Sequence, residues 1–266
     1  MTVLLYHDVL GDARAPASGF AGADAEVYKL PLPLFGAHLD AIAATARAIF
    51  SGPANALAGA LARPATTVLS FDDGGASAWP VTAELLERHG WRGLFFVTTA
   101  RIGSPGFLDA DAIRALARDG HLVGSHSVSH PARMATLDPP SLQREWRDSR
   151  ERLESLLGAP VRIASVPGGY HSAAVARAAA ECGYEVLFTS EPRRVPWRSG
   201  SLLVAGRFSV MRATPPAVAA ALGTGDRVAC TRQSAGWAAK KVLKRVGGPA
   251  WLAFRRRYWE WKAKGR

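Results

Sequence analysis

The chain has 266 residues and a formal net charge of +11 at pH 7, and that charge is concentrated at one end. Residues 227–266 hold twelve Lys or Arg and one acid, whereas the 226 residues before them hold 21 of each sign. A body without excess positive charge excludes a general nucleic-acid-binding surface, so nucleic acid is not an expected partner. No apolar run is long enough to span a bilayer and no signal-peptide pattern opens the chain, so we expect a cytoplasmic protein.

Short apolar segments alternate with helical patterns along the body, which is typical of parallel strands covered by helices. Strands are expected at residues 3–6, 67–71, 93–98, 121–125, 161–166, 184–188 and 202–205. Helices are expected to begin after the capping residues Asp109, Asp138 and Ser172. The pattern predicts an α/β fold with a distorted or incomplete (β/α)7-8 barrel over residues 1–226, followed by a basic, aromatic tail over 227–266.

Two adjacent carboxylates follow the second expected strand. Residues 67–71 run directly into Asp72 and Asp73, which two glycines follow. Strand alternation alone would point the carboxylates apart, but the free φ angles of glycine allow a sharp turn that brings both to one site. A solvated turn without function is the alternative interpretation.

Two histidines follow the fourth expected strand at a spacing of four residues. On one helical turn, His126 and His130 share a face, so both rings can reach one ion. Taken alone, the pair could equally be surface or core histidines, but the acidic strand end favours a metal site. One carboxylate and two imidazoles leave positions open on a divalent cation, for which we expect Zn²⁺, with Co²⁺, Ni²⁺, Fe²⁺ or Mn²⁺ as alternatives.

Residues 70–74 and 126–130 resemble the first two motifs of the polysaccharide deacetylases, the NodB-like carbohydrate esterase family 4. The order of the motifs and their positions after strands agree with that family. The resemblance implies a polysaccharide deacetylase type of barrel, with Asp72 as the catalytic base and Asp73, His126 and His130 as the metal ligands.

Residues 166–170 resemble the third motif of the family, which stabilises an oxyanion through a backbone N–H, here that of Gly168. A simple turn is the alternative interpretation. The family usually has an arginine where this chain has Ser165, which leaves the orientation of Asp72 open. Two arginines, Arg162 and Arg207, are candidates to replace it from another strand end. Tyr170 and His171 are expected to line the substrate groove.

The family's usual C-terminal motif with a catalytic histidine is absent, because no histidine follows His171. Residues 5–8 resemble the N-terminal motif of permuted members that act on poly-N-acetylglucosamine. That resemblance implies that His7 protonates the leaving amine or alcohol. A strand-end histidine bonded to the backbone is the alternative.

The tail combines basic and aromatic residues. On a helix, Trp251, Phe254, Tyr258 and Trp261 share one face, which predicts an interfacial helix on an anionic membrane surface, at the inner face of the membrane. Packing of that face on the barrel, or a disordered basic tail, are the alternatives.

The candidate metal site predicts a metal-dependent hydrolase, and the resemblance implies that it removes acetyl groups from an N- or O-acetylated polysaccharide or a lipid-linked glycan. Activation of water by a metal, with an acidic base beside it, is the chemistry that these residue types supply. A catalytically weakened carbohydrate-binding or scaffold protein, or a hydrolase of a non-sugar amide, are the alternatives.

Overall fold

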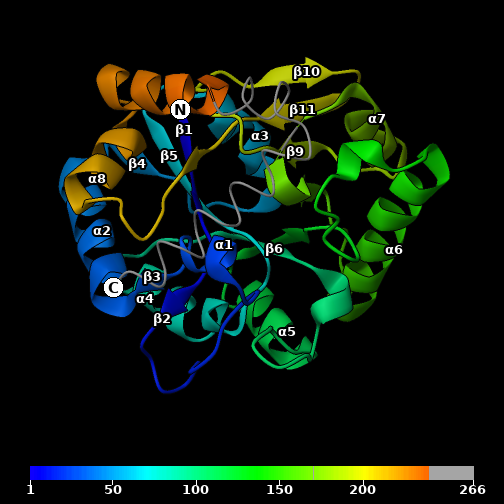
Figure 1. Cartoon of the computed structure of the whole chain (residues 1–266), viewed down its shortest axis with the longest axis horizontal. Coiled ribbons are helices and arrows are strands. Elements are labelled where there is room, and N and C mark those ends of the chain that lie inside the picture. Colours follow the sequence, from blue (N-terminus) through cyan, green and yellow to red (C-terminus); the bar gives the residue numbers. More distant parts are fainter. Residues whose placement is uncertain (170, 240–266) are drawn as a thin grey trace.

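A computed structural model describes residues 1–169 and 171–239. Its centre is a ten-stranded sheet with the order β10-β11-β9-β8-β7-β6-β5-β1-β12, in which β4 also pairs with β5. The strands are β1 (Thr2–Tyr6), β4 (Ala48–Ile49), β5 (Thr66–Phe71), β6 (Leu94–Val97), β7 (Leu122–Ser125), β8 (Ile163–Ser165), β9 (Val186–Phe188), β10 (Trp197–Ser199), β11 (Leu202–Ala205) and β12 (Phe208–Ser209). Within the described residues, only β10 pairs antiparallel in this sheet. The sheet path ends at β10 and β12, so the sheet curls without closing (Figure 1), which confirms the α/β fold with an incomplete barrel.

The seven strands that the sequence predicts are all present. The structure adds β2 (Val9–Leu10) and β3 (Leu30–Pro31), which form a small separate sheet, together with β4, β10 and β12. Most of these additional strands have only two residues, which is too short for a hydrophobic period to reveal them.

Helices surround the curled sheet (Figure 1). They are α1 (Ala23–Glu26), α2 (Leu32–Thr45), α3 (Ala54–Ala62), α4 (Val81–Arg88), α5 (Ala110–Arg118), α6 (Pro139–Leu157), α7 (Ala173–Glu181) and α8 (Pro216–Thr224), with 3₁₀ turns η1 (Ala76–Ala78), η2 (Thr99–Arg101), η3 (Met134–Thr136) and η4 (Pro167–Gly169). The predicted caps are confirmed, because Asp109, Asp138 and Ser172 each accept a hydrogen bond from the backbone N–H three residues later.

Side-chain alternation divides the core between the two faces of the sheet. One buried cluster, which includes Val68, Phe96, Ile163 and Phe188, fills one face together with residues of α3. Gly124 on β7 belongs to this face, because a Cβ there would lie 2.7 Å from the Phe96 ring. Alternation from Val68 places side chains two and four residues later on the same face, where β5 ends. The functional side chains lie at that edge.

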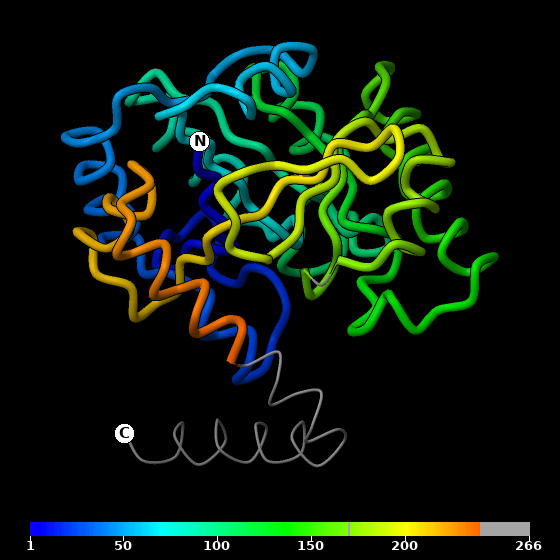
Figure 2. The backbone as a smooth tube through the Cα atoms, turned by 90° about the horizontal axis from the view of Figure 1, so that it is seen from above, coloured from blue at the N-terminus to red at the C-terminus, as the bar shows by residue number. Residues whose placement is uncertain are grey.

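The first part of the predicted tail, residues 227–239, forms a helix against the body (orange in Figure 2). Gln233 exchanges two hydrogen bonds with the backbone of Ser209, at 2.9 and 3.0 Å, and Cys230 is buried in the core. The predicted interfacial face at 251–261 lies outside the described residues, so the membrane surface stays a prediction, as does the division of the chain at residue 226. None of the helices in the described part is long and apolar enough to span a bilayer.

Candidate active site and metal centre

A tight turn at the end of β5 presents the two adjacent carboxylates. The backbone takes the left-handed conformation at Asp73 (φ +77°) and at Gly74 (φ +76°). Left-handed backbone at a non-glycine residue is uncommon, and here it lets the carboxylate of Asp73 approach the same site as that of Asp72. Gly75 is needed for a different reason, because a Cβ there would lie 1.8 Å from Oδ1 of Asp8.

The two histidines lie on a loop after β7. The predicted helical turn is therefore wrong, since φ is +64° at Ser127 and +59° at His130. The carboxylate of Glu145 on α6 holds this loop by accepting hydrogen bonds from the backbone N–H groups of Val128 and Ser129, each at 2.9 Å. The loop brings the rings of His126 and His130 to a centroid separation of 4.9 Å, so the four-residue spacing still pairs them.

One carboxylate and the two imidazoles converge on a single point. Oδ1 of Asp73 lies 3.4 Å from Nε2 of His126 and 3.4 Å from Nε2 of His130, and the three candidate ligand atoms lie within 4.8 Å of one another. Oδ1 of Asp73 is buried and has no hydrogen-bond donor within the described residues. A buried carboxylate oxygen without a donor, facing two imidazole nitrogens, fits a bound cation.

The protonation states also suit metal binding. Nδ1 of His126 lies 2.9 Å from the carbonyl oxygen of Ser165, so this nitrogen carries the proton and the lone pair of Nε2 faces the centre. Burial alone raises the pKa of Asp73, but the interactions with the neighbouring imidazoles of His126 and His130 together outweigh it and lower that pKa well below its usual value. The three side chains therefore fit a divalent cation with nitrogen and oxygen ligands.

A buried ion pair holds the second carboxylate. Nη1 and Nη2 of Arg207 donate to Oδ1 and Oδ2 of Asp72, both at 2.7 Å, and Arg207 is fully buried. The hydroxyl of Ser165 donates to Oδ2 of Asp72 at 3.1 Å and accepts from Nη2 of Arg207 at 2.7 Å. Burial raises the pKa of Asp72, but the charge and hydrogen bonds of Arg207 together with the charge of His126 outweigh burial, and the net pKa is lowered.

Of the two arginine candidates, the structure brings only Arg207 to Asp72. Arg162 instead pairs with Glu185, and about half of each of these two side chains is exposed. Oδ2 of Asp72 is 3.8 Å from Nε2 of His126, so Asp72 lies beside the metal ligands without being the third of them.

Comparisons with known proteins agree with this geometry. Residues 62–187 match the family model described as polysaccharide deacetylase. The chain is 30% identical to a chitin deacetylase of Colletotrichum lindemuthianum over 99 residues, 35% of this chain and 38% of that protein. Its fold is similar to that of a Streptococcus pyogenes deacetylase in complex with acetate (TM-score 0.66, 18% identity, 81% of this chain and 94% of that chain). A polysaccharide deacetylase from Bacillus cereus gives a TM-score of 0.68 at 17% identity, over 83% of this chain and 68% of that chain.

Over residues 62–187 the chain is similar to the polysaccharide deacetylase family. It spans less than half the length of the first curated relatives that it matches. The matched residues include Asp72, Asp73 and both histidines of the candidate metal centre, as well as Ser165. Arg207 lies outside the matched segment, which explains why motif comparison alone could not assign it.

His7 directly follows the end of β1. Its ring packs against Tyr28 at a centroid distance of 4.6 Å, and its Nδ1 is buried without a hydrogen-bond partner among the described residues. Burial lowers the pKa of His7, while the nearby charges of Asp73 and Asp72 oppose that shift. His7 therefore lies within electrostatic range of both carboxylates, and its catalytic role stays a prediction.

The third motif forms a turn near the candidate centre. Gly168 has φ +66° within η4, and a Cβ there would lie 3.4 Å from the carbonyl oxygen of Ala132, in the loop after His130. The ring of His171 packs edge-on against Trp197 at 5.4 Å. Tyr170 lies outside the described residues, so the substrate-binding roles of these three motif residues stay predictions.

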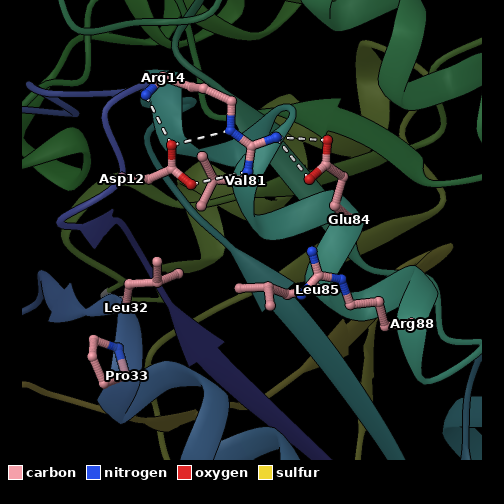
Figure 3. Close-up of a pocket in the computed structure, with 8 residues that line it drawn as sticks. All are labelled: Asp12, Arg14, Leu32, Pro33, Val81, Glu84, Leu85 and Arg88. Atoms are coloured by element: carbon pink, nitrogen blue, oxygen red, sulfur yellow. Dashed lines mark hydrogen bonds and ion pairs between the residues drawn. The ribbon is translucent and has the colours of Figure 1, made fainter.

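A separate pocket of about 310 Å³ lies between α2 and α4 (Figure 3). It is lined by Asp12, Arg14, Leu32, Pro33, Val81, Glu84, Leu85 and Arg88, none of which belongs to the candidate metal centre. Nη1 of Arg14 donates to both carboxylate oxygens of Glu84, at 2.8 and 2.7 Å, while Nε and Nη2 donate to Asp12. These bonds attach the loop at residues 11–22 to α4.

Proposed function

We propose that this protein is a metal-dependent deacetylase that removes acetyl groups from an N- or O-acetylated polysaccharide or lipid-linked glycan. The observation that carries the proposal is the convergence of Asp73, His126 and His130 beside Asp72, with Oδ1 of Asp73 buried and lacking a donor in the described chain. Similarity to the polysaccharide deacetylase family over residues 62–187 supports the same reaction class, and curated relatives include chitin and peptidoglycan deacetylases.

In the proposed reaction, the three ligands hold a divalent cation, for which we propose Zn²⁺. When bound, such an ion polarises an acetyl carbonyl and lowers the pKa of water. Asp72 accepts a proton from the attacking water, and its ionised form is favoured by Arg207. Ser165 and Arg207 hold both carboxylate oxygens of Asp72 in place. The carboxylate therefore needs little rearrangement when the water approaches.

We further propose that His7 gives a proton to the leaving amine or alcohol. Its position beside Asp72 and Asp73, on a strand end distant in sequence from the metal ligands, supports this role. The backbone N–H of Gly168 donates to the carbonyl oxygen as that atom gains negative charge. Tyr170 and His171 line the substrate groove.

The alternative of a catalytically weakened carbohydrate-binding protein was suggested by Ser165 in the third motif. The contact between Arg207 and Asp72 favours the hydrolytic function, because a guanidinium reaches the carboxylate from another strand end. No contact in the described residues favours a non-sugar amide over an acetylated glycan.

Acetate release from a panel of N- and O-acetylated glycans, with and without a chelator, tests the proposal. We expect chelator-sensitive release from at least one glycan, about one metal ion bound per chain, and loss of release in Asp72→Asn with the bound metal retained. Metal binding without acetate release from any glycan would exclude the deacetylase and favour a binding protein.

A further inference from the structure

A wall of aromatic and cationic side chains stands beside the metal ligand His130. The ring of Phe20 packs on His130 at 4.8 Å and edge-on against Phe107 at 5.1 Å. The guanidinium of Arg101 lies over both phenyl rings, 5.4 Å from the centroid of Phe20 and 5.8 Å from that of Phe107. Arg101 therefore contacts Phe20, and Phe20 in turn contacts the metal ligand His130, so Arg101 lies close to the proposed reaction centre.

The wall is built on a fixed backbone. The loop that carries Phe20 is hydrogen-bonded to the next segment through the N–H of Gly19 and the carbonyl of Gly106, at 2.8 Å. The same carbonyl accepts from Ala76, and the N–H of Leu108 donates to Gly74 in the turn that carries Asp73. The wall and the metal ligands therefore share one hydrogen-bonded frame, so the position of Arg101 relative to the centre is set by the fold.

The carboxylate of Asp8 contacts both parts of this frame. A Cβ at Gly19 would lie 1.9 Å from Oδ2 of Asp8, and one at Gly75 would lie 1.8 Å from Oδ1. Ser18 donates to Asp8 at 2.5 Å, and the Ser77 hydroxyl lies 3.3 Å from the same oxygen. The side chain of Asp8 thus lies between the Phe20 loop and the turn after Asp73, and it contacts residues of both segments.

The charge of Arg101 is left uncompensated by the protein. The Arg101 side chain is exposed, and within residues 1–169 and 171–239 no carboxylate forms an ion pair with it. On the β10 side of the strand ends, Arg193 likewise stacks on Trp197 at 4.4 Å and lacks an ion pair in the described part of the chain. A guanidinium that lies over an aromatic ring and has no carboxylate partner keeps N–H donors available, which suits bidentate binding of an anion.

We propose that Arg101, on the platform of Phe20 and Phe107, binds an anionic substituent of the glycan, a carboxylate or a phosphate, close to the acetylated sugar. The aromatic rings contact the apolar face of a saccharide, and the guanidinium pairs with its anion. This inference rests on the proposed function for the identity of the substrate. It narrows that substrate from acetylated glycans in general to those that carry negative charge.

The test compares three chitotetraose derivatives, carboxymethylated, carboxymethylated as the neutral methyl ester, and phosphorylated. For the metal-loaded full chain we measure kcat/KM by acetate release and, separately, binding by saturation-transfer NMR. We expect one or both anionic forms to be favoured over the ester by roughly tenfold, about the value of one hydrogen-bonded charge pair. The two anionic arms distinguish a carboxylate from a phosphate.

Three variants identify the responsible group. Arg101→Gln is expected to abolish the preference for the anion while leaving the ester within about twofold, and Arg101→Lys to restore it in part. Arg63→Gln is the matched control, because Arg63 is an exposed arginine just before β5, at the opposite edge of the sheet, and it should keep the preference. An equal loss for the ester and the anions in Arg101→Gln would mean that Arg101 only supports the platform, and the inference would be wrong.

The outcomes also separate this inference from the proposed function. Binding of the anionic derivatives that depends on Arg101, without acetate release from any derivative, would retain the subsite and exclude the deacetylase. Acetate release without a preference for either anion would retain the deacetylase and exclude the subsite. If none of the three derivatives binds and none releases acetate, both the anion subsite and the deacetylase function are excluded.

Discussion

Replacing Arg207 by glutamine tests how the proposed base is held. The change removes two charge-assisted hydrogen bonds of 2.7 Å from Asp72, whose side chain is 4% exposed and which keeps only the Ser165 hydroxyl as a close donor from this group. Removing one partner of a buried ion pair costs about 3–5 kcal/mol, because the remaining charge is left without compensation. Arg162→Gln is the matched control, since that arginine pairs with an exposed carboxylate and should cost less than about 1 kcal/mol.

The pH dependence of the Arg207→Gln effect separates this mechanism from a simple loss of packing. The pKa of Asp72 is below its unfolded value of 3.8, so the contribution of the ion pair is present above that pH and is lost as the pH falls through the folded pKa. Arg207→Gln raises the pKa of Asp72. Its destabilisation should therefore be largest near pH 7 and shrink as the pH falls through the raised pKa of Asp72 in the variant, because the variant then binds a proton at Asp72 while the folded wild type does not.

Urea denaturation at pH 7 and pH 3.5 measures the two free energies of unfolding for the wild type and both variants. The acidic limb of kcat/KM against pH is the second measurement, and it should move to higher pH in Arg207→Gln if Asp72 is the base. An equal penalty at both pH values, together with an unmoved acidic limb, would refute the assignment of Arg207 as the group that keeps Asp72 ionised.

Three further variants test other parts of the site. Asp73→Asn should reduce bound metal from about one ion per chain to nearly none, measured by elemental analysis after dialysis, because the buried oxygen loses its charge. His7→Gln should lower kcat/KM by roughly 10²–10⁴-fold with bound metal unchanged, and a full-activity variant would exclude His7 as the acid. Burial raises the pKa of Asp8 to about 7, so the folded state binds more protons than the unfolded state between pH 3.8 and 7 and the wild type loses stability as pH rises. Asp8→Asn should lack that loss, roughly 2–3 kcal/mol between pH 5 and pH 8, in urea denaturation at the two pH values.

The placement of the metal ligands could be predicted from the sequence because parallel strands end at one edge of a sheet. Asp73 follows β5 and His126 follows β7, with only β6 between them in the sheet, so an apolar strand before each motif was enough to bring the two together. The conformation of the histidine loop could not be predicted in this way. A spacing of four residues suits both a helical turn and a loop with positive φ at Ser127 and His130, and non-glycine residues in that conformation carry no simple sequence signal.

The choice between Arg162 and Arg207 could have been made from strand alternation. Ile163 and Ala205 both belong to the cluster on the face that Asp72 shares. Arg207 lies two residues beyond Ala205, on that same face, whereas Arg162 lies one residue before Ile163 and points to the other. The platform of Phe20 was less accessible to prediction. Its loop has no periodic pattern, and its position depends on the contacts of Asp8 with glycines distant in the sequence.

The exchange of an arginine for Ser165 is best understood together with Arg207. The Ser165 hydroxyl lies 2.7 Å from Nη2 of Arg207 and 3.1 Å from Asp72, so a longer side chain at position 165 would occupy the space of that guanidinium. The backbone of Ser165 has a second task, because its carbonyl oxygen fixes Nδ1 of His126, and any residue at this position can supply that bond. The side chain at position 165 must therefore leave room for Arg207, which follows β11. The backbone carbonyl at position 165 holds His126 whatever that side chain is. The small Ser165 at the end of β8 and the buried Arg207 after β11 bind each other and together hold the carboxylate of Asp72.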